Sequence, residues 1–325
     1  MKSFFTSILI FITISCTWGQ GLVFDSISFS QQQEFPVERA ALPSRSSLEM
    51  YLPALYPQTG STCVAMSVAL ARTIMYARSI GTTDLSTITR NQMSPYFIYY
   101  CGRNKYDYEC SNGMNPIAAL TVAKEIGFEK MSRIEYPSYW PYTKTFLCPN
   151  SYDFLPPETQ LHINNARAYR INDFYVTKSA AGIKSALSKG YPVILAMQIP
   201  KSFEECTSTI WQSRTYESKS TASGHAMVAI GYDDAINGGS FRIANSWGTE
   251  WGDKGKVWVN YSELEYWLDG AFMMTTSLGS TYRSENLESI NNYKLPKSRT
   301  FRSSEFNGKF NFNNKAYIEI FSNKK

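Results

Sequence analysis

The chain contains only two histidines, His162 and His225, so few side chains could act as a general base near neutral pH. His162 lies in a polar stretch with no other chemically active side chain beside it, and we assign it a surface role. His225 begins an apolar stretch that reads Ala-Met-Val-Ala-Ile-Gly-Tyr-Asp. A residue at the start of a buried strand can stand beside a cleft, so His225 is the candidate base.

Of the six cysteines, five follow the apolar N-terminal stretch: Cys63, Cys101, Cys110, Cys148 and Cys206. In an oxidising compartment an odd number leaves at least one thiol unpaired or paired between chains. Cys63 opens a stretch with apolar residues at helical spacing, and the partial positive charge of a helix start favours a thiolate. The alternative is a small buried apolar residue. We take Cys63 as the candidate nucleophile.

A block after the histidine contains an asparagine followed by two Trp-Gly pairs. It reads Asn245-Ser246-Trp247-Gly248, and Trp251-Gly252 follows four residues after the first pair. An asparagine side-chain oxygen can accept a hydrogen bond from one ring nitrogen of an imidazole and fix its orientation. A tryptophan beside this bond would shield it from water. Two Trp-Gly pairs this close together, just after an asparagine, are rarely seen by chance.

Together these residues resemble the papain-like cysteine peptidases. In that family a Gln and a Gly-rich stretch precede a Cys that opens a long helix, as in Gln58-Thr59-Gly60-Ser61-Thr62-Cys63. A Gly-His-Ala block follows later, before a Gly-Tyr pair, as in Gly224-His225-Ala226 and Gly231-Tyr232. Asn245-Ser246-Trp247-Gly248 is the most specific match. The resemblance covers roughly residues 46 to 275, with the same order of motifs.

The resemblance implies a role for each catalytic position. Cys63 would attack a peptide carbonyl and form a covalent thioester, His225 would exchange the proton, and Asn245 would orient the imidazole. Gln58 and the backbone N–H of Cys63 would stabilise the oxyanion. Gln58 stands five residues before Cys63, where the family usually has six, so the loop between them is one residue shorter.

The resemblance also implies a set of substrate-binding residues. The stretch Cys110-Ser111-Asn112-Gly113-Met114 matches a family segment in which a glycine lets the substrate backbone approach, although Gly113 could equally be a turn glycine. The residues expected to contact substrate are Gly113, Met114, Ala196, Ala226 and Trp247. Three of them, Met114, Ala196 and Ala226, would line a roomy, uncharged pocket between two lobes. Plain core packing is the alternative for all three.

The pattern of apolar residues predicts helices in the first half of the chain and strands in the second. Helices are expected over residues 63–80, 115–127 and 183–189, and strands over 192–197, 225–232, 240–245 and 256–261. We expect an α+β, papain-like two-lobed fold, with a helical N-terminal lobe, a β-rich C-terminal lobe and the active site in the cleft between them. The peptidase domain should span residues 46–278, followed by a basic tail over 279–325.

The first residues predict export. A short basic start and an apolar stretch from Phe4 to Ile14 are typical of a signal peptide over residues 1–19, which would leave Gln20 first. A lipid-modified Cys16 is the alternative. The protein should then be secreted or periplasmic, since no later stretch is apolar enough to be a transmembrane segment. Residues 20–45 form a segment too short for a long helical inhibitory prosegment.

Four cysteines besides Cys63 could form two disulfides. The resemblance implies a Cys101–Cys148 pair, which leaves Cys110 with Cys206, and a Cys101–Cys110 pair is the alternative. Two distant histidines and scattered cysteines lack metal-ligand spacing, so no metal or other cofactor is expected.

Charge and composition narrow the choice of partners. The net charge of +5 is concentrated in residues 281–325, which hold nine Lys and Arg against four Asp and Glu. We therefore expect a protein or peptide substrate, no nucleic-acid partner and a monomer. The rival functions are an inactive papain-like binding protein and a thiol enzyme that transfers another acyl group.

Overall fold

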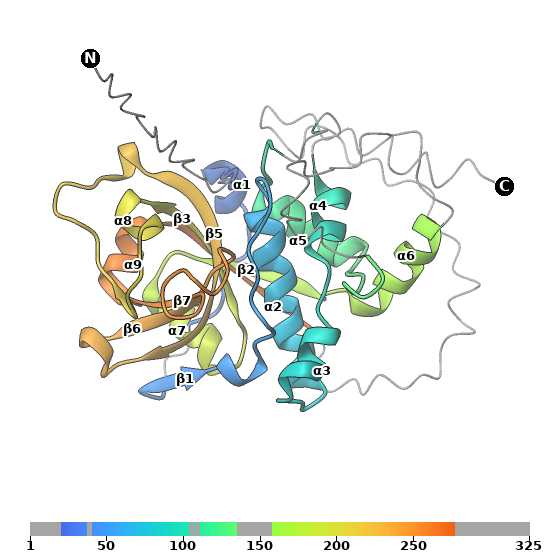
Figure 1. Ribbon diagram of the computed structural model, residues 1–325, viewed down its shortest axis with the longest axis horizontal. Helices are drawn as coiled ribbons and strands as arrows, with labels where there is room; N and C mark the ends of the chain where they lie inside the picture. Colours follow the sequence, from blue (N-terminus) through green and yellow to red (C-terminus); the bar gives the residue numbers. More distant parts are fainter. Residues whose placement is uncertain (1–20, 38–40, 104–106, 108–110, 135–157, 277–325) are drawn as a thin grey trace, which may run out of the picture.

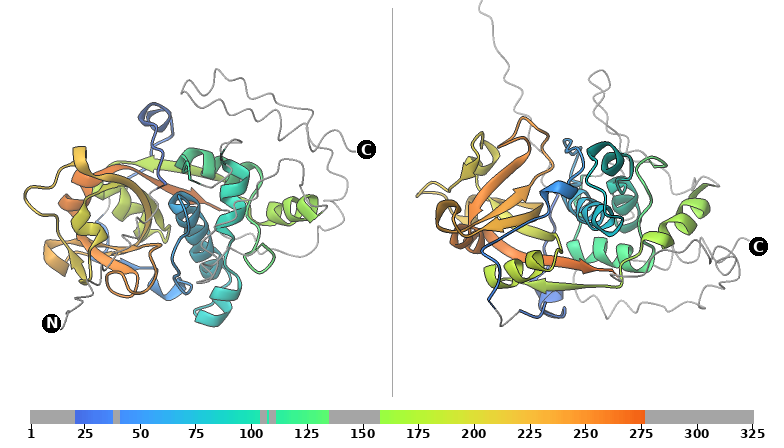
Figure 2. Two further views of the ribbon diagram at one scale, coloured as in Figure 1. Left: turned by 45° about the horizontal axis from the view of Figure 1, so that its top comes forward. Right: turned by 90° about the horizontal axis from the view of Figure 1, so that it is seen from below.

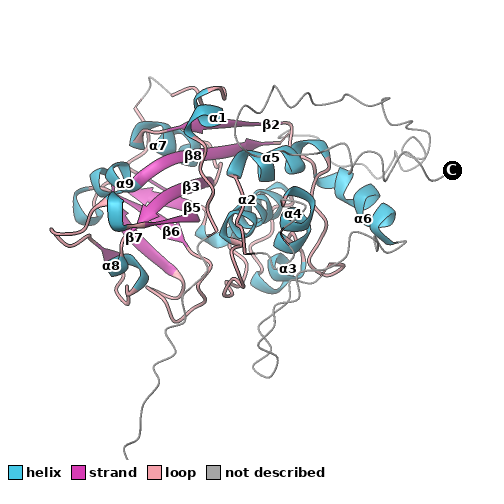
Figure 3. Ribbon diagram, turned by 90° about the horizontal axis from the view of Figure 1, so that it is seen from above, coloured by secondary structure: helices cyan, strands magenta, loops and turns pink. Residues whose placement is uncertain are grey.

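The computed structural model describes residues 21–37, 41–103, 107, 111–134 and 158–276. Figure 1 shows a group of helices on one side and a curved sheet with its own short helices on the other. The views in Figure 2 and the colouring by secondary structure in Figure 3 show the same division. The α+β class and the two-lobed arrangement expected from the sequence are confirmed.

The helical lobe is built around α2, which begins at Cys63. Its helices are α2 (Cys63–Ser79), α3 (Leu85–Arg90), α4 (Pro95–Gly102), α5 (Pro116–Glu125) and α6 (Glu158–Ala166). Most residues of α2 are buried on every side, as expected of a helix at the centre of a lobe. No side chain caps the start of α2, and the Thr62 hydroxyl donates to the Thr59 carbonyl oxygen.

The other lobe contains one sheet, which among the described residues has eight strands. Its order is β2-β8-β3-β5-β6-β7-β4, with β1 paired to β5. The strands are β1 (Arg45–Ser47), β2 (Asp173–Thr177), β3 (Val193–Ile199), β4 (Ile210–Trp211), β5 (Ser223–Asp233), β6 (Ser240–Ala244), β7 (Lys256–Asn260) and β8 (Leu268–Thr275). β3 and β5 are central and almost entirely buried, which explains their continuous apolar sequence.

Short helices pack around the sheet. They are α7 (Ala180–Ser188), α8 (Lys201–Glu204), α9 (Tyr261–Trp267) and α1 (Ser26–Ser30). The buried apolar residues of both lobes belong to one continuous cluster, so the lobes share a core. α2 packs against both β3 and β5. The first residue of α2 is thereby brought beside the strand that carries His225.

Residues 21–37, called the N-terminal segment below, cross from the helical lobe to the outer edge of the sheet. Leu22 forms a parallel bridge with Met114, and Glu34 forms one with Val176 of β2. Between these bridges the segment forms α1, which is capped by the Asp25 carboxylate. Figure 3 shows α1 beside β2. No helix or strand was expected in this segment.

The elements missed from sequence include helices α3, α4 and α6 as well as strands β2 and β8. β8 follows α9 without a turn residue between them, so the change from helix to strand has no local signal. β2 is half-buried along most of its length and lacks a clear alternation. Within the part of the chain described, no helix has both the length and the apolar character needed to cross a bilayer.

Candidate active site

Cys63 is the first residue of α2, and its side chain is fully buried at the junction of the lobes. The backbone amides of Ala226 on β5 and of Gly21 in the N-terminal segment lie close enough to the sulfur to stabilise a thiolate by hydrogen bonding. The helix start adds its partial positive charge. The thiol therefore lies between the start of α2, the strand that carries His225, and the N-terminal segment.

His225 on β5 is held by Asn245, which directly follows β6. Its Nε2 atom lies 2.8 Å from Asn245 Oδ1, and the same oxygen accepts a hydrogen bond from the Ser246 N–H at 2.7 Å. The second bond identifies Oδ1 as the amide oxygen that faces the ring. Nε2 must then carry the proton in the neutral imidazole, which leaves Nδ1 with a lone pair. This tautomer can accept a proton at Nδ1.

The other ring nitrogen of His225 has no hydrogen-bond partner among the described residues, although it is buried. A hydrogen bond between this Nδ1 and the Cys63 sulfur is therefore not formed in the structure. Trp247 lies over the imidazole, with ring centroids 4.6 Å apart and ring planes inclined by 22°. The stacked indole excludes water from the His225–Asn245 bond, which is the position that the sequence predicted for it.

Trp247 is supported by an aromatic cluster around α8. Phe203 lies within 6.0 Å of the rings of Trp211, Trp247 and Trp251, measured between centroids. The Trp251 indole N–H also donates to the Phe203 carbonyl oxygen at 2.9 Å. The second Trp-Gly pair of the sequence thus supports the first, because both indoles pack against the same phenylalanine.

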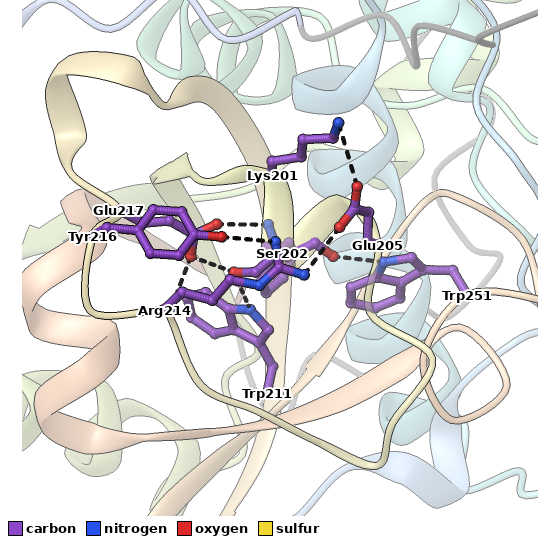
Figure 4. A network of polar contacts seen from close by, with 9 residues as sticks. Lys201, Ser202, Glu205, Trp211, Arg214, Tyr216, Glu217 and Trp251 are labelled. Carbon is purple, nitrogen blue, oxygen red and sulfur yellow. Dashed lines mark hydrogen bonds and ion pairs between the residues drawn. The ribbon is translucent and has the colours of Figure 1, made fainter.

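A polar network fixes α8 and the loop that leads into β5 (Figure 4). The Glu217 carboxylate accepts hydrogen bonds from the backbone N–H and the hydroxyl of Ser202 and from the Arg214 N–H, at 2.5–2.9 Å. The Ser202 hydroxyl oxygen accepts from the Trp211 indole at 3.2 Å. These bonds hold down the pKa of Glu217 against the opposing effect of burial. The carboxylate therefore stays charged and organises both segments.

Gln58 lies in the loop before α2, buried against the residue that follows Asn245. Its side-chain oxygen accepts from the Ser246 hydroxyl at 2.7 Å, and its nitrogen donates to the Gly60 carbonyl oxygen at 3.1 Å. The Gln58 backbone N–H also donates to the Ser246 carbonyl oxygen. The amide orientation is thus set by Ser246, a residue that the sequence analysis did not assign to the site. The shorter loop still holds Gln58 between the lobes.

Burial dominates the ionisation of the catalytic pair. It raises the pKa of Cys63 to about 11, although nearby backbone amides oppose the shift. It lowers the pKa of His225 to about 4, against the opposing effect of the Asn245 hydrogen bond. Both shifts favour the uncharged form. At pH 7 the structure therefore contains a neutral thiol beside a neutral imidazole.

The N-terminal segment is responsible for much of this burial. The Gly21 carbonyl oxygen accepts from the Met114 N–H at 2.8 Å, and the Val23 N–H donates to the Met114 carbonyl oxygen at 3.1 Å. A Cβ atom placed on Gly113 would lie 2.3 Å from the Gly21 oxygen, and one on Gly21 would lie 1.9 Å from the Ser61 oxygen. Neither glycine could be replaced without displacing backbone, so the segment lies tightly against the candidate site.

Of the three residues expected to form the specificity pocket, two lie side by side on the sheet. Ala196 on β3 is paired directly with Ala226 on β5 and with Gly270 on β8. Directly paired residues project to the same face, and a Cβ on Gly270 would lie 2.4 Å from the Phe29 ring. Phe29 of the N-terminal segment therefore covers Gly270, at one end of this row of small residues. Sequence reasoning missed Gly270.

Met114 differs from the expectation, because its side chain is buried in the helical lobe. A Cβ on Gly102, at the end of α4, would lie 3.2 Å from the Met114 terminal methyl group. Met114 contacts the N-terminal segment through its backbone N–H and C=O groups. His162 also differs from the assigned surface role, because it is partly buried with Nδ1 3.2 Å from the fully buried Glu129 carboxylate.

The disulfides expected from sequence are not formed among the described residues. Cys206 has a free thiol, which donates to the Ser208 carbonyl oxygen at 3.5 Å, so the pairing of Cys110 with Cys206 finds no support. Cys110 and Cys148 lie outside the described residues, and the Cys101–Cys148 pair stays a prediction.

Comparison with known proteins places these features in context. The model of the papain family cysteine proteases matches residues 60–267. A cathepsin B-like cysteine proteinase 2 from Haemonchus contortus is 32% identical over 170 residues, which cover 52% of this chain and 40% of that protein. Gamete and mating-type specific protein A from Dictyostelium discoideum is 34% identical over 97 residues, which cover 30% of this chain and 20% of that protein. The matched regions thus span two-fifths or less of these relatives.

Solved structures share the fold. Xylellain, a cysteine protease from Xylella fastidiosa, aligns with a TM-score of 0.65 and 22% identity, over 79% of this chain and 96% of that one. Procathepsin B S9 from Trypanosoma congolense aligns with a TM-score of 0.62 and 16% identity, over 79% of this chain and 86% of that one. At these identities the likeness concerns the fold alone.

The neutral state of the pair leads to a first prediction. At pH 7 a thiol of pKa about 11 is ionised in about one molecule in 10⁴, so iodoacetamide should alkylate Cys63 of the full chain slowly. The rate should rise about tenfold per pH unit from pH 7 to 9, without a plateau. Mass spectrometry of the peptide containing Cys63 measures this separately from other cysteines. Fast alkylation that is already constant below pH 6 would contradict the prediction.

Proposed function

Because the chain belongs to the papain family of cysteine proteases, we propose that it hydrolyses peptide bonds through Cys63, His225 and Asn245. The observation that carries this proposal is the 2.8 Å bond between His225 Nε2 and Asn245 Oδ1. It leaves Nδ1 as the proton acceptor on a strand whose next residue contacts the Cys63 sulfur through its amide. A thiol at a helix start, a base of fixed tautomer and an orienting amide form a complete nucleophilic system.

The proposed reaction begins when Cys63 transfers its proton to His225 Nδ1. The thiolate attacks the carbonyl carbon of the scissile peptide, and negative charge develops on the carbonyl oxygen. The Cys63 backbone N–H and the Gln58 side chain donate hydrogen bonds to that oxygen. The imidazolium then protonates the leaving amine, and a thioester remains. Water, deprotonated by His225, hydrolyses the thioester and regenerates the thiol.

The N-terminal segment would hold this activity in check. Its Gly21 amide contacts the Cys63 sulfur, and its backbone pairs with Met114, where an extended substrate would have to bind. The segment is further held by Phe29, which packs against Phe272 at 5.3 Å, and by Phe35, which contacts Tyr175 and Tyr191. Substrate binding therefore requires the segment to leave the site.

Specificity would come from the row of small residues on the sheet, of which Phe29 covers Gly270. Ala196, Ala226 and Gly270 present little side-chain volume and no charge. We expect this surface to accept an apolar side chain on the residue before the one whose carbonyl is attacked. Burying a Phe- or Leu-sized group there would contribute about 1.5–3 kcal/mol. A lysine or arginine would lose hydration without gaining a partner.

Export and domain boundaries remain proposals beside this function. Residues 1–19 and the tail from 279 lie outside the described residues, as do Cys16 and Gln20. A peptidase domain over residues 46–278 stays a proposal: β8 ends at Thr275, inside it, whereas β1 begins at Arg45 and Leu22 and Glu34 already pair with the two lobes. A monomer acting on protein or peptide substrates is the simplest arrangement for such a domain.

The second prediction concerns release of the N-terminal segment. Gly21→Ala in the full chain adds one methyl group that would overlap the Ser61 backbone, so the segment should be expelled. Hydrolysis of a fluorogenic peptide should rise about tenfold or more, since overpacking of this kind costs about 1–3 kcal/mol. Ile27→Ala is the matched control, because Ile27 is in the same segment but 65% exposed. Equal activity in both variants and the parent chain would refute the inhibitory role.

The third prediction concerns the catalytic residues, tested in the Gly21→Ala chain. Cys63→Ala should abolish peptide hydrolysis, because no nucleophile remains. Asn245→Ala should lower kcat by about 10²-fold and leave KM nearly unchanged, since Asn245 orients the imidazole and transfers no proton. Steady-state kinetics on one fluorogenic peptide compare the variants. Turnover retained by Cys63→Ala would exclude the assigned nucleophile.

The fourth prediction concerns the pocket, again in the Gly21→Ala chain. A positional peptide library should show a preference for Phe and Leu at the residue before the attacked carbonyl. Gly270→Ala should shift that preference towards smaller side chains, because the new methyl group would occupy the place of a bound ring. A preference for Lys or Arg at that position would show that specificity is set elsewhere.

A further inference from the structure

We propose that Tyr99 and Asp107 are positioning residues that hold the Gly113–Met114 backbone at a fixed place relative to Cys63. This inference rests on the proposed function, in which that backbone pairs with an extended peptide substrate. Neither residue contacts the catalytic groups. Their role would be to fix the edge on which the peptide lies, so that its carbonyl carbon meets the sulfur.

The two residues form a buried polar contact beside this edge. The Tyr99 hydroxyl donates to Asp107 Oδ2 at 2.5 Å, and Asp107 Oδ1 accepts from the Ser111 N–H at 2.9 Å. The Tyr99 hydroxyl oxygen also lies 3.5 Å from the Gly113 carbonyl oxygen. Tyr99 is 0% and Asp107 2% exposed. One carboxylate therefore joins helix α4 to the residues that precede Gly113.

Because this contact is buried, losing it would cost more free energy than losing an exposed hydrogen bond. Burial and the neighbouring carboxylate both raise the pKa of Tyr99, so its hydroxyl stays protonated and donates. A buried carboxylate must keep its hydrogen bonds, and removing one donor costs more than an exposed bond would. Such a contact permits one arrangement of the chain where apolar packing would tolerate several.

A second contact ties the same edge to the same helix. The Met114 side chain packs against Gly102, the last residue of α4, while Tyr99 lies one turn earlier. α4 in turn packs against α2, the helix that begins at Cys63. The path from the nucleophile to the edge thus runs through two packed helices and two side-chain contacts.

The Gly113–Met114 edge already forms main-chain hydrogen bonds, with the backbone of the N-terminal segment. Both the N–H and the C=O of Met114 are bonded to the N-terminal segment, at 2.8 and 3.1 Å. Gly113 has φ +72° and leaves room for the Gly21 carbonyl oxygen. A peptide bound by main-chain groups takes its position from the edge. A shift of the edge would therefore move the reactive carbonyl relative to Cys63, which is costly for rate.

The test compares two reagents that both react with Cys63 in the full-length Gly21→Ala chain. Iodoacetamide needs only the thiol and its base, whereas a dipeptidyl epoxide must also pair with the edge. Tyr99→Phe should lower the second-order rate constant for the peptidyl epoxide about tenfold and change that for iodoacetamide less than twofold. Asp107→Asn should give an intermediate loss, because its single carbonyl oxygen can keep one of the two hydrogen bonds.

Tyr100→Phe is the matched control, since Tyr100 is on the same helix but stacks on Arg103, 4.6 Å from its ring centroid. It should change neither rate constant. Thermal melts by circular dichroism identify variants that do not fold, and if Tyr99→Phe is one of them, the same ratio in Asp107→Asn decides. Equal losses with both reagents, or no loss with either, would overturn the positioning role. A Gly21→Ala chain that reacts with iodoacetamide yet hydrolyses no peptide would instead count against the proposed function.

Discussion

The removal of Cys63 and His225 from water is the constraint on which the rest of this structure depends. Burial acts on the two groups in opposite directions, raising the pKa of the thiol and lowering that of the imidazole, and both changes favour the neutral pair. The start of α2 and the Asn245 hydrogen bond favour the charged forms but do not prevail while the N-terminal segment is in place. In the proposed mechanism, chemistry at this pair requires that the segment leave.

Much of the site could be predicted from sequence because its chemistry is carried by rare residues in distinctive local settings. Cys63 begins an apolar helix, and His225 is the third residue of β5, where its continuous apolar run starts. The expected strands over 225–232, 240–245 and 256–261 agree with β5, β6 and β7 within two residues. β6 is buried throughout and β7 alternates between buried and half-buried positions, and turn residues rich in Gly, Asp and Asn separate the strands, so their lengths and boundaries can be read from sequence.

Other features could not be predicted, because they depend on contacts between segments that are distant in sequence. Only glycine fits at position 21, because a Cβ atom there would overlap the Ser61 backbone. The residues beside Gly21 in the sequence do not indicate this contact. In the sequence, Asp107 stands among polar and aromatic residues of the kind found in many surface loops. Only the structure shows that it is buried against Tyr99. The Thr62 hydroxyl bonds to the Thr59 carbonyl oxygen and does not cap α2, a choice between two local hydrogen bonds that residue type alone does not decide.

The same burial links closure of the site to pH. Backbone hydrogen bonds and aromatic packing hold the N-terminal segment in place, and the Lys178 and Lys189 ammonium groups lie over its Phe29 and Phe35 rings. The Cys63–His225 pair beneath the segment titrates. Burial in the closed state lowers the pKa of His225, so this state disfavours protonation of the ring. Acid therefore favours opening. Above the ordinary pKa of a thiol, ionisation of Cys63 favours opening in the same way, so closure is most stable near neutral pH.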